Sequence, residues 1–113
     1  MTITNALASV PVKDLKSSMK WYERLFGRPA DAAPMPEVAE WKFSGGGWLQ
    51  VYELGQRAGA GSVTLAVRDL EDQVEKMRRL GIEVKRPMAS SRMKVVMVKD
   101  PDGNSIAFAE TAQ

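Results

Sequence analysis

Three side chains at alternate positions, Trp48, Gln50 and Tyr52, are the residues of this sequence best suited to contact a ligand. Alternate residues of a strand share one face, so two aromatic rings would flank one amide there. Rings offer stacking surfaces and the amide offers directional hydrogen bonds, a usual composition for a small-molecule site. Filling of a core or an interface by Trp48 and Tyr52 is the alternative interpretation.

The chain has no cysteine and no histidine. Thiolate nucleophiles, disulfides and thiolate metal sites are therefore excluded, and the commonest metal ligand is missing. Catalysis without metal would need a perturbed acid or base, such as Tyr52 or Lys94 in a buried cleft, or Glu40 in a third strand. The alternation of side chains along a strand places Glu53 and Glu110 on the side that faces a helix or at strand ends, where solvated or salt-bridged carboxylates are expected.

Sixteen basic residues against fourteen acidic ones give a net charge of +2. This charge is too small and too interspersed for a nucleic-acid interface. The segment 84–99 is locally basic and contains no acidic residue; its basic residues are Lys85, Arg86, Arg92, Lys94 and Lys99. This bias favours an anionic ligand, and solvated basic side chains on strand faces and edges are the alternative.

A chain of 113 residues with 44% hydrophobic content can bury one ordinary core, so we expect a single domain over 1–113. No stretch approaches the roughly 18 apolar residues of a membrane helix, and the first residues lack the pattern of a secretory signal. We therefore expect a cytoplasmic protein with no membrane partner.

The sequence contains an internal repeat. Val12-Lys13-Asp14-Leu15 returns 55 residues later as Val67-Arg68-Asp69-Leu70. Each aspartate is a plausible N-cap, with the helices running to about Phe26 and Leu80 and ending at Gly27 and Gly81. Strands are expected at 6–12, 38–43, 48–54, 62–67, 93–98 and 104–110, with a further short one at 82–85 and at most a short edge strand within 28–37. The repeat predicts two modules, 1–54 and 62–113, joined by a flexible glycine-rich linker at 55–61.

Strand parity predicts which side chains face a cleft. Val10 and Val12, like Val63 and Leu65, are expected against the helices, which leaves small and polar groups on the opposite face. The orientation of Trp41 stays open, because the loop before it fixes no register. The predicted ligand-contacting residues are Ser9, Trp41, Trp48, Gln50, Tyr52, Ser62, Thr64 and Arg92.

Two motifs carry a family resemblance. Val10-Pro11-Val12-Lys13-Asp14-Leu15 leads to Trp21-Tyr22, and Asp100-Pro101-Asp102-Gly103-Asn104 precedes the last expected strand. Their order, together with the repeat, resembles the vicinal oxygen chelate superfamily of glyoxalases, bleomycin-resistance proteins and extradiol dioxygenases over nearly the whole chain. The resemblance implies an α+β fold in which two βαβββ modules form curved mixed sheets around a concave cleft, commonly in a homodimer. The 100–104 segment is also fully explained as a type I turn followed by a left-handed glycine.

The resemblance also implies where a metal would bind. The ligand positions of metal-dependent relatives correspond here to Leu7, Gln50, Ser62 and Ala107. Leucine and alanine have no donor atom, and a hydroxyl with one amide oxygen falls short of the ligands that a divalent cation needs. We therefore expect no metal and no cofactor.

Three functions remain open. The leading hypothesis is a metal-independent protein that binds an aromatic or amphipathic small molecule, which the basic segment suggests is anionic. The second is a glyoxalase-like lyase, isomerase or dioxygenase with unusual or partner-supplied catalytic residues. The third is a dimerisation or regulatory module without a ligand.

Overall fold

The computed structural model describes residues 2–85, 88–89 and 93–111. In chain order the elements are β1 (Leu7–Val12), α1 (Leu15–Phe26), β2 (Ala32–Met35), β3 (Val38–Lys42), β4 (Trp48–Glu53), the 3₁₀ turn η1 (Gly55–Arg57), β5 (Ser62–Ala66), α2 (Leu70–Arg79), β6 (Met88–Ala89), β7 (Met93–Lys99) and β8 (Ser105–Thr111). The order is βαβββ twice, as the repeat predicts.

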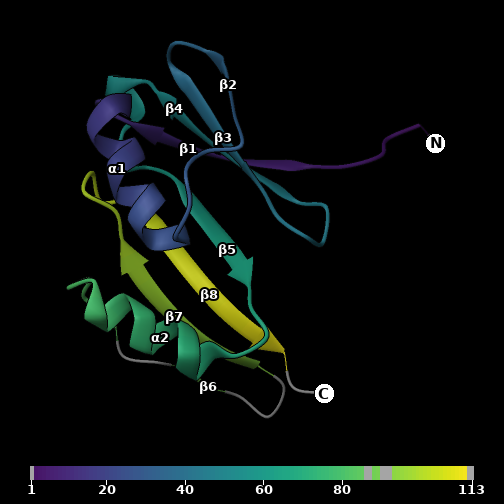
Figure 1. The fold of residues 1–113 in the computed structure, drawn as a ribbon, viewed down its shortest axis with the longest axis vertical. Helices are drawn as coiled ribbons and strands as arrows, with labels where there is room; N and C mark the ends of the chain where they lie inside the picture. The colour runs from purple at the N-terminus through teal and green to yellow at the C-terminus, as the bar shows by residue number, and fades with distance from the viewer. Residues whose placement is uncertain (1, 86–87, 90–92, 112–113) are drawn as a thin grey trace.

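The strands form two four-stranded mixed sheets, ordered β1-β4-β3-β2 and β5-β8-β7-β6. In each sheet the first strand of the module pairs in parallel with the last, and the remaining pairs are antiparallel. The two sheets approach each other at β1 and β5, and Figure 1 shows them diverging from there. This arrangement confirms the predicted α+β fold class.

The helix caps are those that the sequence predicts. The Asp14 carboxylate accepts a hydrogen bond from the Ser17 backbone N–H, and Asp69 accepts one from Asp72. Gly27 ends α1 with a φ of 73°, a left-handed conformation that glycine adopts without strain.

The strand predicted at 82–85 is wrong. Gly81 has a φ of 77°, and the N–H of Ile82 donates to the carbonyl of Met77 over 3.0 Å. These residues therefore terminate α2 in a Schellman-type turn with Ile82 buried. The short strand beside β7 is Met88–Ala89.

The helix-facing sides of both sheets build one continuous core, as parity predicts. Its fully buried members include Val10, Val12, Trp41, Leu49, Val51, Val98 and Ile106. Because side chains of both modules belong to this cluster, the two halves fold around a shared interior.

The segment predicted as a flexible linker packs closely against β1. It contains η1, and Gly61 lies so near β1 that a Cβ there would be 2.8 Å from Pro11 Cδ and 2.9 Å from Asn104 Oδ1. Because glycine has no Cβ, it allows the backbone at this position to lie close to β1. Neither α1 nor α2, the helices of the described segments, is long and apolar enough to cross a membrane.

Candidate functional site

The open face of the first sheet, the face turned away from α1, is a grid of three cross-strand rows. Strand register sets Ser9, Gln50 and Glu40 side by side in the middle row of this face. The Ser9 hydroxyl donates to Gln50 Oε1 over 3.3 Å, and Gln50 Nε2 donates to Glu40 Oε2 over 2.9 Å. Gln50 is therefore held between two partners of its own sheet.

Glu40 lies between Gln50 and Ala32 of β2 in this row and is only 8% exposed. Within the described segments, the Lys–carboxylate and Arg–carboxylate ion pairs all involve other acidic residues. Glu40 therefore has the Gln50 amide as its hydrogen-bond donor and keeps oxygen lone pairs that could accept from a cation.

The outer row of the open face contains Leu7, Trp48 and Lys42. Trp48 is half-buried, and the Lys42 ammonium nitrogen lies 4.3 Å from the centroid of its ring. This distance is that of a cation–π contact, so the ring already attracts positive charge. The third row contains Pro11, Tyr52 and Val38, which places Tyr52 on the same face as Trp48.

A crevice of about 630 Å³ opens where the two modules diverge. We call it the intermodule crevice. It is lined by Ala6, Leu7, Ala8, Phe26, Phe43, Ser44, Gly45, Gly47, Trp48, Val63, Thr64, Leu65, Ala66, Val67 and Phe108. Its volume is in the range of small-molecule sites, and its walls are largely apolar. Trp48 belongs to both the crevice and the open face, so the two surfaces adjoin.

The second sheet contributes smaller side chains. Thr64 faces Ala107, and Ser62 faces Ser105, across the β5–β8 pair. Ser62 and Thr64 are both exposed, and of the two, Thr64 lines the crevice.

Trp41 does not lie with the other predicted site residues. Its ring is fully buried on the helix side of β3, with centroids 6.0 Å from Tyr22 and 5.5 Å from Phe26. Its indole N–H donates to the carbonyl of Arg28. Trp41 is a core residue, and it does not extend the aromatic wall.

Lys94 and Lys99, two described lysines of the basic segment, do not lie on the first open face. Lys94 and Lys99 lie on opposite faces of β7: Lys94 faces α2, and the Lys99 ammonium donates to Ser105 Oγ over 2.7 Å. The predicted contact Arg92, and Arg86 beside it, lie outside the described residues.

The four chelating positions of metal-dependent relatives are distributed over four strands. Leu7 lies in β1, Gln50 in β4, Ser62 in β5 and Ala107 in β8. Two of them have no donor atom, and both polar ends of Gln50 are engaged by Ser9 and Glu40. These residues do not fit a divalent cation, and the described segments contain no cluster of three metal-ligating side chains.

Two carboxylates that parity places on the helix side anchor the helices. Glu53 Oε1 accepts from the Leu15 N–H over 2.9 Å, and Glu110 Oε1 accepts from the Leu70 N–H over 2.7 Å. A carboxylate at a helix N-terminus satisfies an otherwise unpaired N–H and complements the helix dipole. These two residues have a structural role that the expectation of solvated carboxylates missed.

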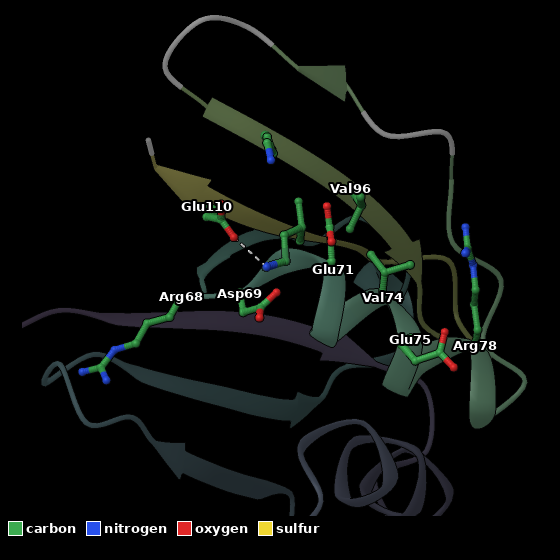
Figure 2. A pocket seen from close by; sticks show the side chains of 10 residues that line it. Arg68, Asp69, Glu71, Val74, Glu75, Arg78, Val96 and Glu110 are labelled. Carbon is green, nitrogen blue, oxygen red and sulfur yellow. Dashed lines mark hydrogen bonds between the residues drawn. The ribbon is translucent and has the colours of Figure 1, made fainter. Parts of the chain in front are cut away.

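A further cavity, of about 540 Å³, lies between α2 and β7 (Figure 2). Val74 and Val96 form apolar parts of its wall, and Lys94 also lines it. Its carboxylates Asp69 and Glu110 already accept hydrogen bonds from the start of α2. None of the predicted ligand-contacting residues in the described segments lines this cavity.

The 100–104 turn connects the modules, which its sequence alone does not reveal. The Tyr22 hydroxyl donates to Asp100 Oδ2 over 2.7 Å. The Asn104 amide donates to the same oxygen and to the carbonyl of Pro11. Burial of the phenol, followed by the adjacent Asp100 charge, raises the pKa of Tyr22 far above its ordinary value.

Sequence and structure comparisons agree with this architecture. Residues 4–108 match the family model of the Glyoxalase/Bleomycin resistance protein/Dioxygenase superfamily. No curated protein sequence matches the chain.

Solved structures give the same result. A glyoxalase/bleomycin resistance protein from Catenulispora acidiphila DSM 44928 is 30% identical, with 97% of this chain and 100% of that chain covered and a TM-score of 0.87. TnmS3, an antibiotic binding protein from Streptomyces sp. CB03234, is 21% identical over 99% of each chain, with a TM-score of 0.82. A bleomycin resistance determinant encoded on the transposon Tn5 is 17% identical, with 98% and 100% covered and a TM-score of 0.82. The chain therefore belongs to the Glyoxalase/Bleomycin resistance protein/Dioxygenase superfamily.

Proposed function

We propose that this protein binds an aromatic or amphipathic small molecule without a metal ion. The observation that carries the proposal is the intermodule crevice, whose apolar walls end at Trp48 beside the polar row of the open face. An apolar cavity with few polar anchors is typical of ligand sites. The aromatic moiety would enter the crevice and stack on Trp48.

The metal-free part of the proposal is supported by the residues at the chelating positions. Leu7 and Ala107 offer no ligand atom, and Gln50 is engaged within the first sheet. Two proteins of the same fold are an antibiotic binding protein and a bleomycin resistance determinant. At their low identity they support the fold alone, so the ligand class rests on the crevice.

We include a homodimer in the proposal. Leu7 and Met93 are large apolar side chains, and 47% and 43% of them are exposed. Burying such groups against a second copy would remove apolar surface from water. Sedimentation at binding concentrations should give about twice the chain mass of 12.5 kDa, and Leu7→Gln should shift the protein toward monomer. A monomeric wild type would remove the dimer from the proposal.

The experiment that tests binding is a thermal-shift screen of aromatic compounds on protein treated with a chelator. A ligand at about 100 times its dissociation constant adds roughly 2.7 kcal/mol to the free energy of unfolding, so the melting temperature should rise without added metal. Elemental analysis of untreated protein is the companion measurement. Stoichiometric metal, with stabilisation lost on chelation, would replace the proposal by the lyase, isomerase or dioxygenase alternative.

A further inference from the structure

We propose that Glu40 selects ligands with a positively charged group, which its carboxylate receives while the aromatic part of the ligand stacks on Trp48. This inference rests on the proposed function and names the charge of the ligand where it would extend past Trp48 from the crevice onto the adjoining open face. It is opposite in sign to what the basic segment 84–99 suggests.

The burial of Glu40 is the first support. Its side chain belongs to the open face yet Glu40 is only 8% exposed, and it accepts a hydrogen bond from the Gln50 amide over 2.9 Å. No cation of the described chain forms an ion pair with it. Hydrogen bonds between a carboxylate and a positively charged donor are stronger than those with a neutral donor, so a cationic ligand gains free energy that a neutral one does not.

The orientation of Gln50 is the second support. Because Ser9 donates to Gln50 Oε1, the amide must turn Nε2 toward Glu40. One N–H of Gln50 Nε2 therefore donates inside the row, and the second N–H of that group remains. Beside it, Glu40 keeps unused oxygen lone pairs, which accept hydrogen bonds and favour donors that carry positive charge.

The contact of Lys42 with Trp48 is the third support and comes from a different row. The Lys42 ammonium lies 4.3 Å from the ring centroid, so this ring binds a cation of the chain itself. A charged ligand can take this place, because the lysine side chain is long and exposed and regains hydration when it leaves.

The register brings the two acceptors of positive charge close to each other. Glu40 pairs with Gln50 and Lys42 pairs with Trp48, so Glu40 and Trp48 are diagonal neighbours on one face. Diagonal pairs lie about 7–8 Å apart, within reach of long and aromatic side chains. A bicyclic aromatic ring with a one-carbon ammonium arm matches this spacing.

The experiment compares three related compounds: 1-naphthylmethylamine, which is cationic at neutral pH, the neutral 1-naphthylmethanol and the anionic 1-naphthoate. Calorimetric titration would measure their dissociation constants with wild type, with Glu40→Gln and with Glu37→Gln. Glu37 is exposed and directly precedes β3, so its substitution removes the same charge away from the row. Wild type should bind the amine about tenfold or more tightly than the alcohol.

Glu40→Gln should remove that preference, whereas Glu37→Gln should retain it. If Glu40→Gln does not fold, Lys42→Met gives an independent result: freeing the Trp48 ring should tighten amine binding and leave alcohol binding nearly unchanged. Wild type that binds the alcohol or the naphthoate as tightly as the amine would overturn the inference and leave the proposed function standing. Failure of all three compounds to bind would count against both.

Discussion

The hydroxyl of Tyr22 in α1 donates a 2.7 Å hydrogen bond to Asp100, which lies in the turn between β7 and β8. Both residues are buried. The bond joins the first module to the second across 78 residues of sequence. It is one of the contacts that hold the two modules together, and residues of both modules line the intermodule crevice.

Tyr22→Phe should lower the free energy of unfolding by about 1.5–3 kcal/mol, the usual worth of a hydrogen bond to a charged group. Denaturant titration at neutral pH measures the loss. Tyr52→Phe, on the open face, removes the same hydroxyl from a less buried site and should cost less. Equal losses in the two variants would mean that the hydrogen bond between Tyr22 and Asp100 adds no more stability than the less buried hydroxyl of Tyr52 does.

The same residue predicts a response to alkaline pH. The pKa of Tyr22 is raised in the folded protein. The stability that Tyr22 contributes is therefore fully present at pH values below its pKa in the unfolded chain, which is about 10. Above that pH the unfolded chain loses the phenolic proton and the folded chain keeps it, so stability falls. Unfolding free energies between pH 8 and 11 should decline more steeply for wild type than for Tyr22→Phe. Parallel curves would contradict this.

Glu110→Ala and Glu53→Ala should each lower the free energy of unfolding by about 0.5–2 kcal/mol, the usual worth of a helix cap. The reason is that each carboxylate holds the first N–H of a helix. Urea denaturation is the measurement. Glu83→Ala removes a side chain that is 84% exposed and is the matched control, expected to change stability by less than about 0.5 kcal/mol. Losses no larger than the control would show that the two bonds are dispensable.

Sequence periodicity predicted the framework because it reflects local rules. Alternation placed Val10 and Val51 inside, and aspartate followed by an apolar stripe marked both helix starts. Sequence periodicity failed for features that depend on a contact with a residue distant in the sequence. The role of Glu40 depends on its cross-strand neighbour Gln50, and Trp41 could be oriented only once the register of β3 was known.

The segment 55–61, expected to be a flexible linker, shows the same limit of prediction from sequence. Glycine-rich composition reads as flexibility, because composition does not tell a mobile glycine from one that permits close packing. Gly61 is of the second kind. The sequence also contained a signal for the polar row that parity could have used: Glu40 and Lys42 alternate as Gln50 and Trp48 do.

Gly61→Ala should destabilise the protein by about 1–3 kcal/mol, the usual cost of overpacking, because its new methyl group would meet Pro11 and Asn104. Gly45→Ala is the matched control, since open space surrounds Gly45 and its φ is not positive. Thermal unfolding of the two variants gives the comparison. Equal melting temperatures would refute the close-packing role of the linker.

Trp48→Ala should weaken binding of an aromatic ligand by about tenfold or more, since ring stacking is worth about 0.5–1.5 kcal/mol beyond the apolar area lost. Met35→Ala, at an exposed position of β2, should leave affinity unchanged. Calorimetric titration of both variants with an aromatic ligand measures the two affinities. If Trp48→Ala instead dissociates a dimer and alters no ligand response, the residue belongs to an interface, as in a dimerisation module.

The central claim is that the surface around Trp48 binds a small molecule without metal. The three tryptophans report on it directly, because Trp21 and Trp41 pack in the core region and Trp48 lines the crevice. The measurement is a titration of chelator-treated, ¹⁵N-labelled protein with 1-naphthylmethylamine and 1-naphthylmethanol, following the three indole N–H signals by NMR. The account predicts a saturable shift of the Trp48 signal with the Trp41 signal nearly unchanged. A Trp48 signal that stays fixed, or that moves only after a divalent cation is added, would contradict it.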